Sequence, residues 1–271
     1  MEHNRISVRP GSPLGSSPGS SPGHWMVGLG AITLVLGLVT LAGAFLFAPA
    51  DSIQGDVQRI FYIHVPMALC AYLAAGLVAA AGLLFLVTRR VVWDVMARCS
   101  AECAVLFTTL VLITGSLWGK PVWGTWWTWD ARLTSTLMLW FIFVGYLMLR
   151  SYIGDTERAA RYSVVVGVLG AIDIPLVHVS VEWWRTLHPQ GILDSASGSP
   201  ALPGSMLVVF AVGTLTMLCM FGLLMMLRIR LEMLRYRVTA LEQETLDEAD
   251  EAITPSHPSR PIAARVLGDG A

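Results

Sequence analysis

Six apolar runs, each long enough to cross a lipid bilayer, dominate this sequence of 271 residues. They cover residues 25–47, 65–87, 99–117, 133–149, 162–179 and 205–227. At about 1.5 Å of rise per residue, a helix of roughly 17–25 residues crosses a hydrocarbon core of about 30 Å. We therefore predict an all-α membrane protein built as a bundle of six transmembrane helices.

The composition excludes several other classes of protein. The chain is 55% apolar and 14% charged, whereas a soluble domain carries roughly 25% charge. A net charge of -1 gives no basic field for nucleic acid. The four cysteines form no C-x-x-C pair, and no arrangement of side chains indicates an enzyme. A soluble enzyme, a disulfide scaffold and a nucleic-acid binder are all disfavoured.

Polar segments flank the six runs. Residues 1–24 are rich in Gly, Ser and Pro, and we predict a disordered cytoplasmic tail. Residues 25–227 form the predicted membrane domain, and residues 228–271 a cytoplasmic C-terminal tail that begins basic and turns acidic. Residues 48–50 resemble a signal-peptidase site, but the run before them exceeds the roughly 7–15 apolar residues of a signal peptide. We predict an uncleaved first span.

Lys and Arg residues are distributed unequally between the two sides of the predicted bundle. Twelve fall before the first run, between the second and third, between the fourth and fifth, and just after the sixth. The opposite side has four, namely Arg59, Lys120, Arg132 and Arg185. Because positive charge marks cytoplasmic loops, we predict that both termini are cytoplasmic and that three loops lie outside: 48–64, 118–132 and 180–204.

Tryptophan is concentrated in the predicted outer loops. Of the ten tryptophans, two lie in loop 180–204 and five in loop 118–132, WGKPVWGTWWTWDAR. These five are Trp118, Trp123, Trp126, Trp127 and Trp129. An aromatic belt that only anchors a membrane scaffold is one interpretation, but a belt enriches tryptophan at both interfaces. The one-sided cluster favours a surface for a flat, aromatic ligand.

The spacing within loop 118–132 suggests a preformed surface. A helix over 123–130 would place Trp123, Trp126, Trp127 and Asp130 on one face. Asp130 then has two interpretations. It either forms a salt bridge with Arg132 or orients an indole N–H, or it caps a helix that begins near residue 133.

Two histidines flank the tryptophan-rich loop from separate outer segments. His64 lies in YIHVP at the start of the second run, and His188 lies in TLHPQG of the last outer loop. A single interfacial histidine is usually a hydrogen-bonded structural residue, but a pair beside a broad aromatic surface indicates axial ligands of haem iron. The ligand spacing disfavours zinc. A third histidine, His178, ends the fifth run, and we expect a structural role for it.

Two acidic residues lie inside apolar runs and support an alternative function. Intramembrane carboxylates are costly and are candidates for function by default. Glu102 is near the cytoplasmic end of its run, where Arg98 can pair with it, and Asp173 precedes Pro175, where a broken helix would expose carbonyls. The alternative is a haem or ion-coupled transporter, although no internal repeat or pair of interrupted helices accompanies these residues.

The segment WGKPVWGTWWTWDARLTS resembles the tryptophan-rich WWD signature of haem-handling membrane proteins. The flanking stretches FAPADSIQGDVQRIFYIHVP and HVSVEWWRTLHPQG are similar to those of the CcmC family of bacterial cytochrome c maturation. The resemblance covers about residues 45–190. It implies that non-covalent haem b is held at the outer (periplasmic) face of the inner membrane, with His64 and His188 as axial ligands and loop 118–132 against the macrocycle.

The resemblance also implies partners. Proteins of this family present haem to the chaperone CcmE, and they associate with the ABC transporter subunits CcmA and CcmB and the small membrane protein CcmD. Lys120, Arg132 or Arg185 would pair with haem propionates through charge-assisted hydrogen bonds. The Gly/Ser/Pro-rich head, the acidic tail and the charge of Asp173 depart from what we expect of this family.

Overall fold

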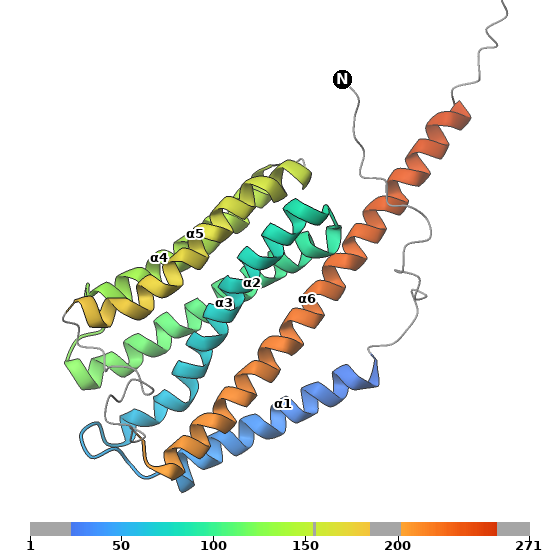
Figure 1. Ribbon diagram of the computed structural model, residues 1–271. Coiled ribbons are helices and arrows are strands. Elements are labelled where there is room, and N and C mark those ends of the chain that lie inside the picture. Colours follow the sequence, from blue (N-terminus) through green and yellow to red (C-terminus); the bar gives the residue numbers. More distant parts are fainter. Residues whose placement is uncertain (1–22, 154–155, 185–201, 254–271) are drawn as a thin grey trace, which may run out of the picture. The chain divides into compact units, whose positions relative to one another are not determined.

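Six long helices make up the chain in the computed structural model, which describes residues 23–153, 156–184 and 202–253 (Figure 1). They are α1 (His24–Ala42), α2 (Phe61–Thr88), α3 (Val91–Trp123), α4 (Ala131–Tyr152), α5 (Thr156–Trp183) and α6 (Gly204–Ile253). Two short helical segments lie between α1 and α2: the π-helical η1 (Gly43–Phe47) and the 3-10 helix η2 (Asp56–Ile60). All six long helices are apolar and long enough to cross a membrane. The predicted all-α membrane fold with six spans is confirmed.

The chain divides into two units, one ending at Ile229 and one beginning at Arg230. The first unit contains α1 to α5 and the beginning of α6. The second contains the remainder of α6. The helix α6 includes the predicted sixth span, 205–227, and continues without interruption to Ile253.

The helix α3 likewise extends beyond the predicted third span, 99–117. It begins at Val91 and includes Asp94. Asp94 accepts two hydrogen bonds from Arg150 of α4, at 2.6 and 2.7 Å, and both side chains are buried. A paired carboxylate can be buried inside a helical bundle where an unpaired one would be costly. The helix therefore extends beyond the purely apolar run.

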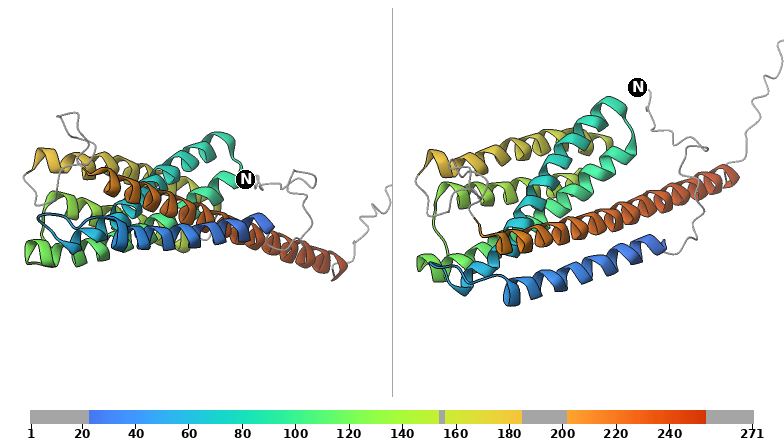
Figure 2. Two further views of the ribbon diagram at one scale, coloured as in Figure 1. Left: turned by 90° about the horizontal axis from the view of Figure 1, so that it is seen from below. Right: turned by 60° about the horizontal axis from the view of Figure 1, so that its bottom comes forward.

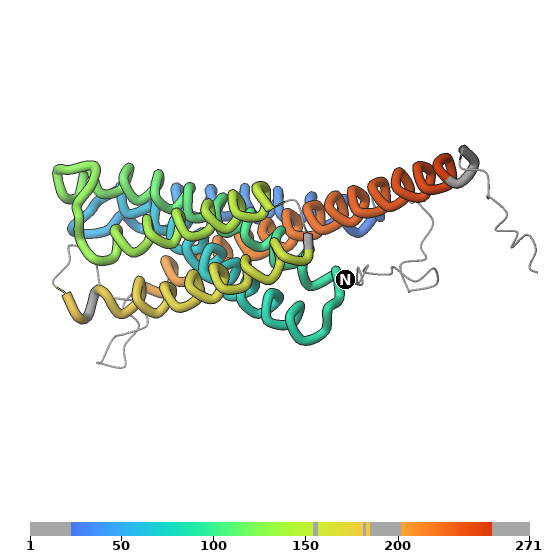
Figure 3. The backbone as a smooth tube through the Cα atoms, turned by 90° about the horizontal axis from the view of Figure 1, so that it is seen from above, coloured from blue at the N-terminus to red at the C-terminus, as the bar shows by residue number. Residues whose placement is uncertain are grey.

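Small residues bring the helices of the first unit close together. The helix α2 packs against both α3 and α5, and α4 runs beside α5 (Figure 3). A Cβ atom at Gly167 of α5 would lie 2.8 Å from Val78 of α2. A Cβ atom at Gly213 of α6 would lie 2.5 Å from the carbonyl oxygen of Tyr62 in α2. Glycine at these crossings permits the close backbone approach typical of membrane helices.

The helix α1 packs beside the beginning of α6, as both views of Figure 2 show. The hydroxyl oxygens of Thr40 in α1 and Thr216 in α6 lie 2.9 Å apart in a buried hydrogen bond. Phe210 of α6 stacks on Phe61 of α2, with ring centroids 5.1 Å apart. A shared hydrogen bond and ring contact fix α1 and α6 beside the start of α2.

One end of the first unit collects the segments that the sequence singled out. The connection between α2 and α3 at the opposite end is very short, because Arg89 adopts a left-handed conformation (φ 54°) that ends α2. The start of α2 and the end of α3 consequently meet. We use the term tryptophan end for this region, which comprises residues 48–64, 114–123 and 124–132.

Candidate functional site

His64 lies in the first turn of α2, against the end of α3. Its Nδ1 is 2.8 Å from the hydroxyl oxygen of Thr114. A Cβ atom at Gly115 would lie 3.2 Å from Cε1 of His64, so the imidazole ring is close to the backbone of α3. The ring also meets Trp118 edge to face, with centroids 5.6 Å apart and planes at 80°. Three positions of α3 thereby hold the His64 ring in place.

Trp118 connects this histidine to residues 48–60. Its indole Nε1 donates a 2.8 Å hydrogen bond to Oε1 of Gln54, and its ring packs edge to face on Phe61. Trp118 is partly buried against the apolar cluster formed by η1, the start of α2 and the start of α6. Its indole N–H is satisfied and its ring is packed, so its position is determined by the fold.

A tight turn presents Gln54 to Trp118. Asp51 and Gly55 bond to each other through their backbones, and Oδ1 of Asp51 accepts hydrogen bonds from the N–H groups of Ile53 and Gln54 at 2.9 and 2.8 Å. Gly55 has a φ of +61°, a conformation that glycine adopts without strain. The aspartate turn fixes the backbone of residue 54 and so aims its side chain.

The helix expected over residues 123–130 does not form, and the shared face that it would have created is absent. The helix α3 continues through Trp123 and ends at Gly124, which has a φ of +78° and donates its N–H to the carbonyl of Lys120. A left-handed glycine terminates a helix. Residues 124–130 form a non-helical connection to α4. Trp118 and Trp123 are therefore helical residues rather than loop residues.

The remaining three tryptophans lie in the connection 124–130 and differ in exposure. Trp126 is 57% exposed and Trp129 is 77% exposed. Trp127 is partly buried, and it meets Trp129 edge to face at 5.6 Å. Its indole Nε1 is buried and has no hydrogen-bond partner among the described residues. Lys120 lies 6.0 Å from the ring of Trp126. The rings of Trp126 and Trp129 thus present exposed apolar area, whereas the indole N–H of Trp127 is buried beside them.

Asp130 caps α4, which is one of its two predicted interpretations. Its Oδ1 accepts hydrogen bonds from the backbone N–H groups of Arg132 and Leu133, each at 3.0 Å. Its Oδ2 accepts a hydrogen bond from the hydroxyl of Thr128 at 2.7 Å. An aspartate cap satisfies N–H groups that have no partner within the helix. The cap places Arg132 in the first turn of α4, directly after the tryptophans.

Other predicted residues are spread over the structure. His188 and Arg185 lie outside the described residues. His178 is exposed on α5.

The two acidic residues inside apolar runs differ in their surroundings. Glu102 pairs with Arg98, 3.9 Å away, and with Arg228 of α6, as expected for an acidic residue that arginines compensate. The helix α5 runs unbroken through Pro175, so the broken helix that would have supported the transporter alternative does not form there. Asp173 itself is 6% exposed.

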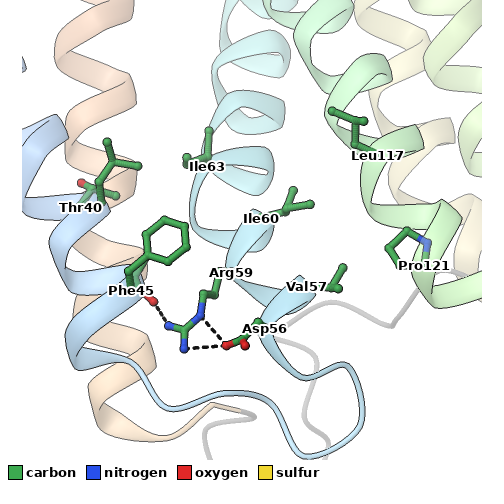
Figure 4. A pocket seen from close by; sticks show the side chains of 11 residues that line it. Thr40, Phe45, Asp56, Val57, Arg59, Ile60, Ile63, Leu117 and Pro121 are labelled. Carbon is green, nitrogen blue, oxygen red and sulfur yellow. Dashed lines mark hydrogen bonds and ion pairs between the residues drawn. The ribbon is translucent and has the colours of Figure 1, made fainter.

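A cavity of about 370 Å³ opens near the tryptophan end, between α1, η1, η2, α2 and α3 (Figure 4). Its wall is mostly apolar, with Phe45, Ile60 and Leu117 among its lining residues. Arg59 enters this wall and donates hydrogen bonds to the carbonyls of Ala44 and Ala48 and to Asp56. Among the described residues, none of the predicted haem residues lines the cavity. Arg59 links η2 to η1 through the carbonyls of Ala44 and Ala48.

Sequence reasoning missed three residues that shape this end of the molecule: Gln54, Arg59 and Thr114. Gln54 and Thr114 each contact a predicted residue across at least 50 positions of the chain. A signal was available only for Thr114, which lies one helical turn before Trp118 and so shares its face of α3. Arg59 was counted only as a charge on the outer side.

Comparison with known proteins places the chain in a family. It matches the family CcmC, described as Heme exporter protein C, over residues 20–244. It is 39% identical to Heme exporter protein C of Bradyrhizobium diazoefficiens, over 80% of this chain and 81% of the relative. It is likewise 39% identical to that of Haemophilus influenzae, over 79% and 83%. A relative in Escherichia coli K12 is 36% identical over 76% and 85%. These matches show that the chain belongs to the Heme exporter protein C (CcmC) family.

Proposed function

We propose that this protein binds haem at the outer face of a bacterial inner membrane and presents it to the chaperone CcmE during the maturation of c-type cytochromes. The observation that carries the proposal is the geometry of the tryptophan end. There a histidine with a fixed ring lies beside clustered indoles, in a chain whose relatives are named heme exporters. The protein would act by binding and transfer, and we assign it no catalytic side chain.

Haem is the substrate in this account, held non-covalently as haem b. His64 and His188 would supply the two axial ligands, since neutral imidazole is a common ligand of haem iron. His64 has the properties that such a ligand requires. Its ring is oriented through a hydrogen bond to Thr114 at Nδ1, and supporting contacts of this kind are typical of metal-bound histidines.

The tryptophans would provide the surface for the macrocycle. A porphyrin is flat and largely apolar, so it gains from burial and from contact with aromatic rings. The exposed rings of Trp126 and Trp129 and the buried indole N–H of Trp127 offer both apolar contact and a donor. Lys120 and Arg132, which border these rings in the sequence, and Arg185 in the last outer loop would pair with the propionates.

The remaining parts of the proposal concern location and assembly. The tryptophan end would lie outside the cytoplasm, and the excess of Lys and Arg in the opposite loops supports this orientation. The protein would associate with CcmA, CcmB and CcmD in a CcmABCD-type complex, and membership of the CcmC family supports this part of the proposal. Hydrolysis of ATP would then be a property of the partners.

The proposal is tested by the absorption spectrum of the purified protein loaded with haem. We expect a six-coordinate, low-spin spectrum for the wild type, because two imidazoles give a strong ligand field. His64→Ala and His188→Ala should each change that spectrum. His178→Ala, which removes an exposed histidine of α5, is the matched control and should leave it unchanged. Identical spectra for all three variants would remove the axial-ligand assignment.

A further inference from the structure

The hydrogen bond between His64 and Thr114 has a direction that the surrounding bonds determine. The Thr114 hydroxyl has a single proton. Its oxygen lies 2.7 Å from the carbonyl oxygen of Leu110, one turn earlier in α3, and 3.3 Å from that of Val111. A carbonyl can only accept, so the hydroxyl proton points along α3. Toward His64, the hydroxyl can only act as an acceptor.

The direction of this bond fixes the protonation of the imidazole ring. Nδ1 of His64 lies 2.8 Å from the Thr114 hydroxyl, and it must donate the proton that the bond contains. In a neutral imidazole one nitrogen carries the proton and the other carries the lone pair. For a neutral ring, this arrangement of bonds favours the tautomer with the proton on Nδ1 and the lone pair on Nε2.

We propose that Thr114 is a positioning residue that prepares His64 to ligate haem iron through Nε2. The inference rests on the proposed function, and it assigns to Thr114 a role that the sequence did not suggest. An acceptor at the far nitrogen of a ligating histidine selects the tautomer, orients the ring and increases the basicity of the ligand. Gly115 and Trp118 add steric limits on the same ring.

The hydroxyl group of Thr114 supports a positioning role for this residue rather than a role in packing alone. Any small residue at position 114 would fill space beside His64, but only a hydroxyl or a similar acceptor selects the Nδ1-protonated tautomer. The same helix contains a comparison. Thr109 bonds back to the carbonyl of Val105 at 2.7 Å and accepts a 2.8 Å hydrogen bond from the indole of Trp140. Thr109 thus makes the same pair of bonds, away from any predicted ligand.

The test compares Thr114→Val, Thr114→Ser and Thr109→Val in the full-length protein loaded with haem. Valine is close in shape to threonine and removes the acceptor, whereas serine retains it. We expect Thr114→Val to lose haem to a competing acceptor protein about 10-fold more readily, in line with other residues that support metal ligands. We also expect its haem midpoint potential to rise, because a less basic imidazole stabilises ferric iron less.

Thr114→Ser should stay within about twofold of the wild type in both measurements, and Thr109→Val should match the wild type, since each retains the acceptor beside His64. If Thr114→Val and Thr109→Val behave alike, the positioning role is wrong. The His64→Ala spectrum separates this failure from failure of the proposed function. A changed spectrum in His64→Ala together with an unchanged Thr114→Val would overturn only the role of Thr114.

A second measurement reads the tautomer of His64 directly in the wild-type protein. In haem-free protein labelled with ¹⁵N-histidine, the two ring nitrogens of His64 have shifts that distinguish the tautomers, and His64→Ala identifies the signals. We expect the proton on Nδ1. A proton on Nε2 would overturn the inference, because Thr114 would then be the donor.

Discussion

The tryptophan-rich segment consists of two parts that the fold treats differently. Trp118 and Trp123 belong to α3, and we call them the helical tryptophans. The ring of Trp118 is bonded to Gln54 and packed on Phe61. Trp126, Trp127 and Trp129 follow the helix end at Gly124, and we call them the loop tryptophans. Two of the loop tryptophans expose more than half of their surface.

Under our proposal, the tryptophan-rich segment combines residues that support the site with residues that contact the ligand. A ring whose N–H is satisfied inside the protein has little left to offer a ligand, but it can hold a neighbouring residue in place. Trp118 does so for His64. An exposed ring, or a buried N–H without a partner, has unused capacity for contact. We therefore propose a supporting role for Trp118 and haem contact for the loop tryptophans.

Trp118→Ala has the largest expected effect. The change removes the ring contact with Phe61, the hydrogen bond that Trp118 donates to Gln54, and the ring contact with His64. Because replacing a packed tryptophan by alanine costs about 3 kcal/mol or more, we expect a lower free energy of unfolding for the detergent-solubilised protein. We also expect a heterogeneous haem spectrum.

The matched control for Trp118→Ala is Trp126→Ala, a change in an exposed ring. Its free energy of unfolding should differ from the wild type by no more than about 0.5 kcal/mol. Equal destabilisation by the two changes would contradict the division between helical and loop tryptophans.

Replacing Trp126 and Trp127 together by alanine has the next largest effect, and it should act on haem rather than on stability. The double variant loses exposed apolar area and the unpaired indole N–H. We expect reduced retention of haem and reduced loading of a haem chaperone, with thermal unfolding close to that of the wild type. Retention is measured as haem bound per chain after gel filtration.

Trp25→Ala and Trp93→Ala provide controls for this double variant, because both residues lie away from the tryptophan end. Under our account they leave haem retention unchanged. If they reduce it as much as the double variant does, the tryptophans act as an interfacial belt, and the assignment of the loop tryptophans is wrong.

The smallest expected effect belongs to the intramembrane acids. Glu102 is paired with arginines, whereas one carboxylate oxygen of Asp173 is buried without a hydrogen-bond partner among the described residues. That oxygen is the observation that favours the alternative, a haem or ion-coupled transporter. Neutralising both residues, as Glu102→Gln and Asp173→Asn, should leave haem binding at the tryptophan end unchanged. A large loss of bound haem in this variant would favour the transporter.

The sequence predicted the number of membrane helices because hydropathy is a local property. The helix ends were harder to place. The predicted third span omitted Asp94, since a charge interrupts an apolar run, and the buried partner Arg150 lies 56 residues away. The sixth span was also cut at the first arginines, although α6 continues beyond them. Local patterns do not reveal which distant group compensates a charge.

The residues of the candidate site were also predicted better than the contacts that hold them in place. The residue types pointed to His64 and to the tryptophans, and the comparisons confirm the family that those residues suggested. The supporting contacts were not predictable, because Gln54 meets Trp118 across 64 residues and Thr114 meets His64 across 50. The wrong helix over 123–130 has a local cause, since the left-handed Gly124 ends α3 within the motif.

The absorption spectrum of the wild-type protein, purified from haem-replete cells, tests the central claim most directly. That claim is that the imidazoles of His64 and His188 bind haem iron as axial ligands, with the macrocycle against the loop tryptophans. We predict a coloured protein with about one haem per chain and the spectrum of low-spin iron bound by two histidines. A colourless protein that also fails to take up added haem would contradict the account.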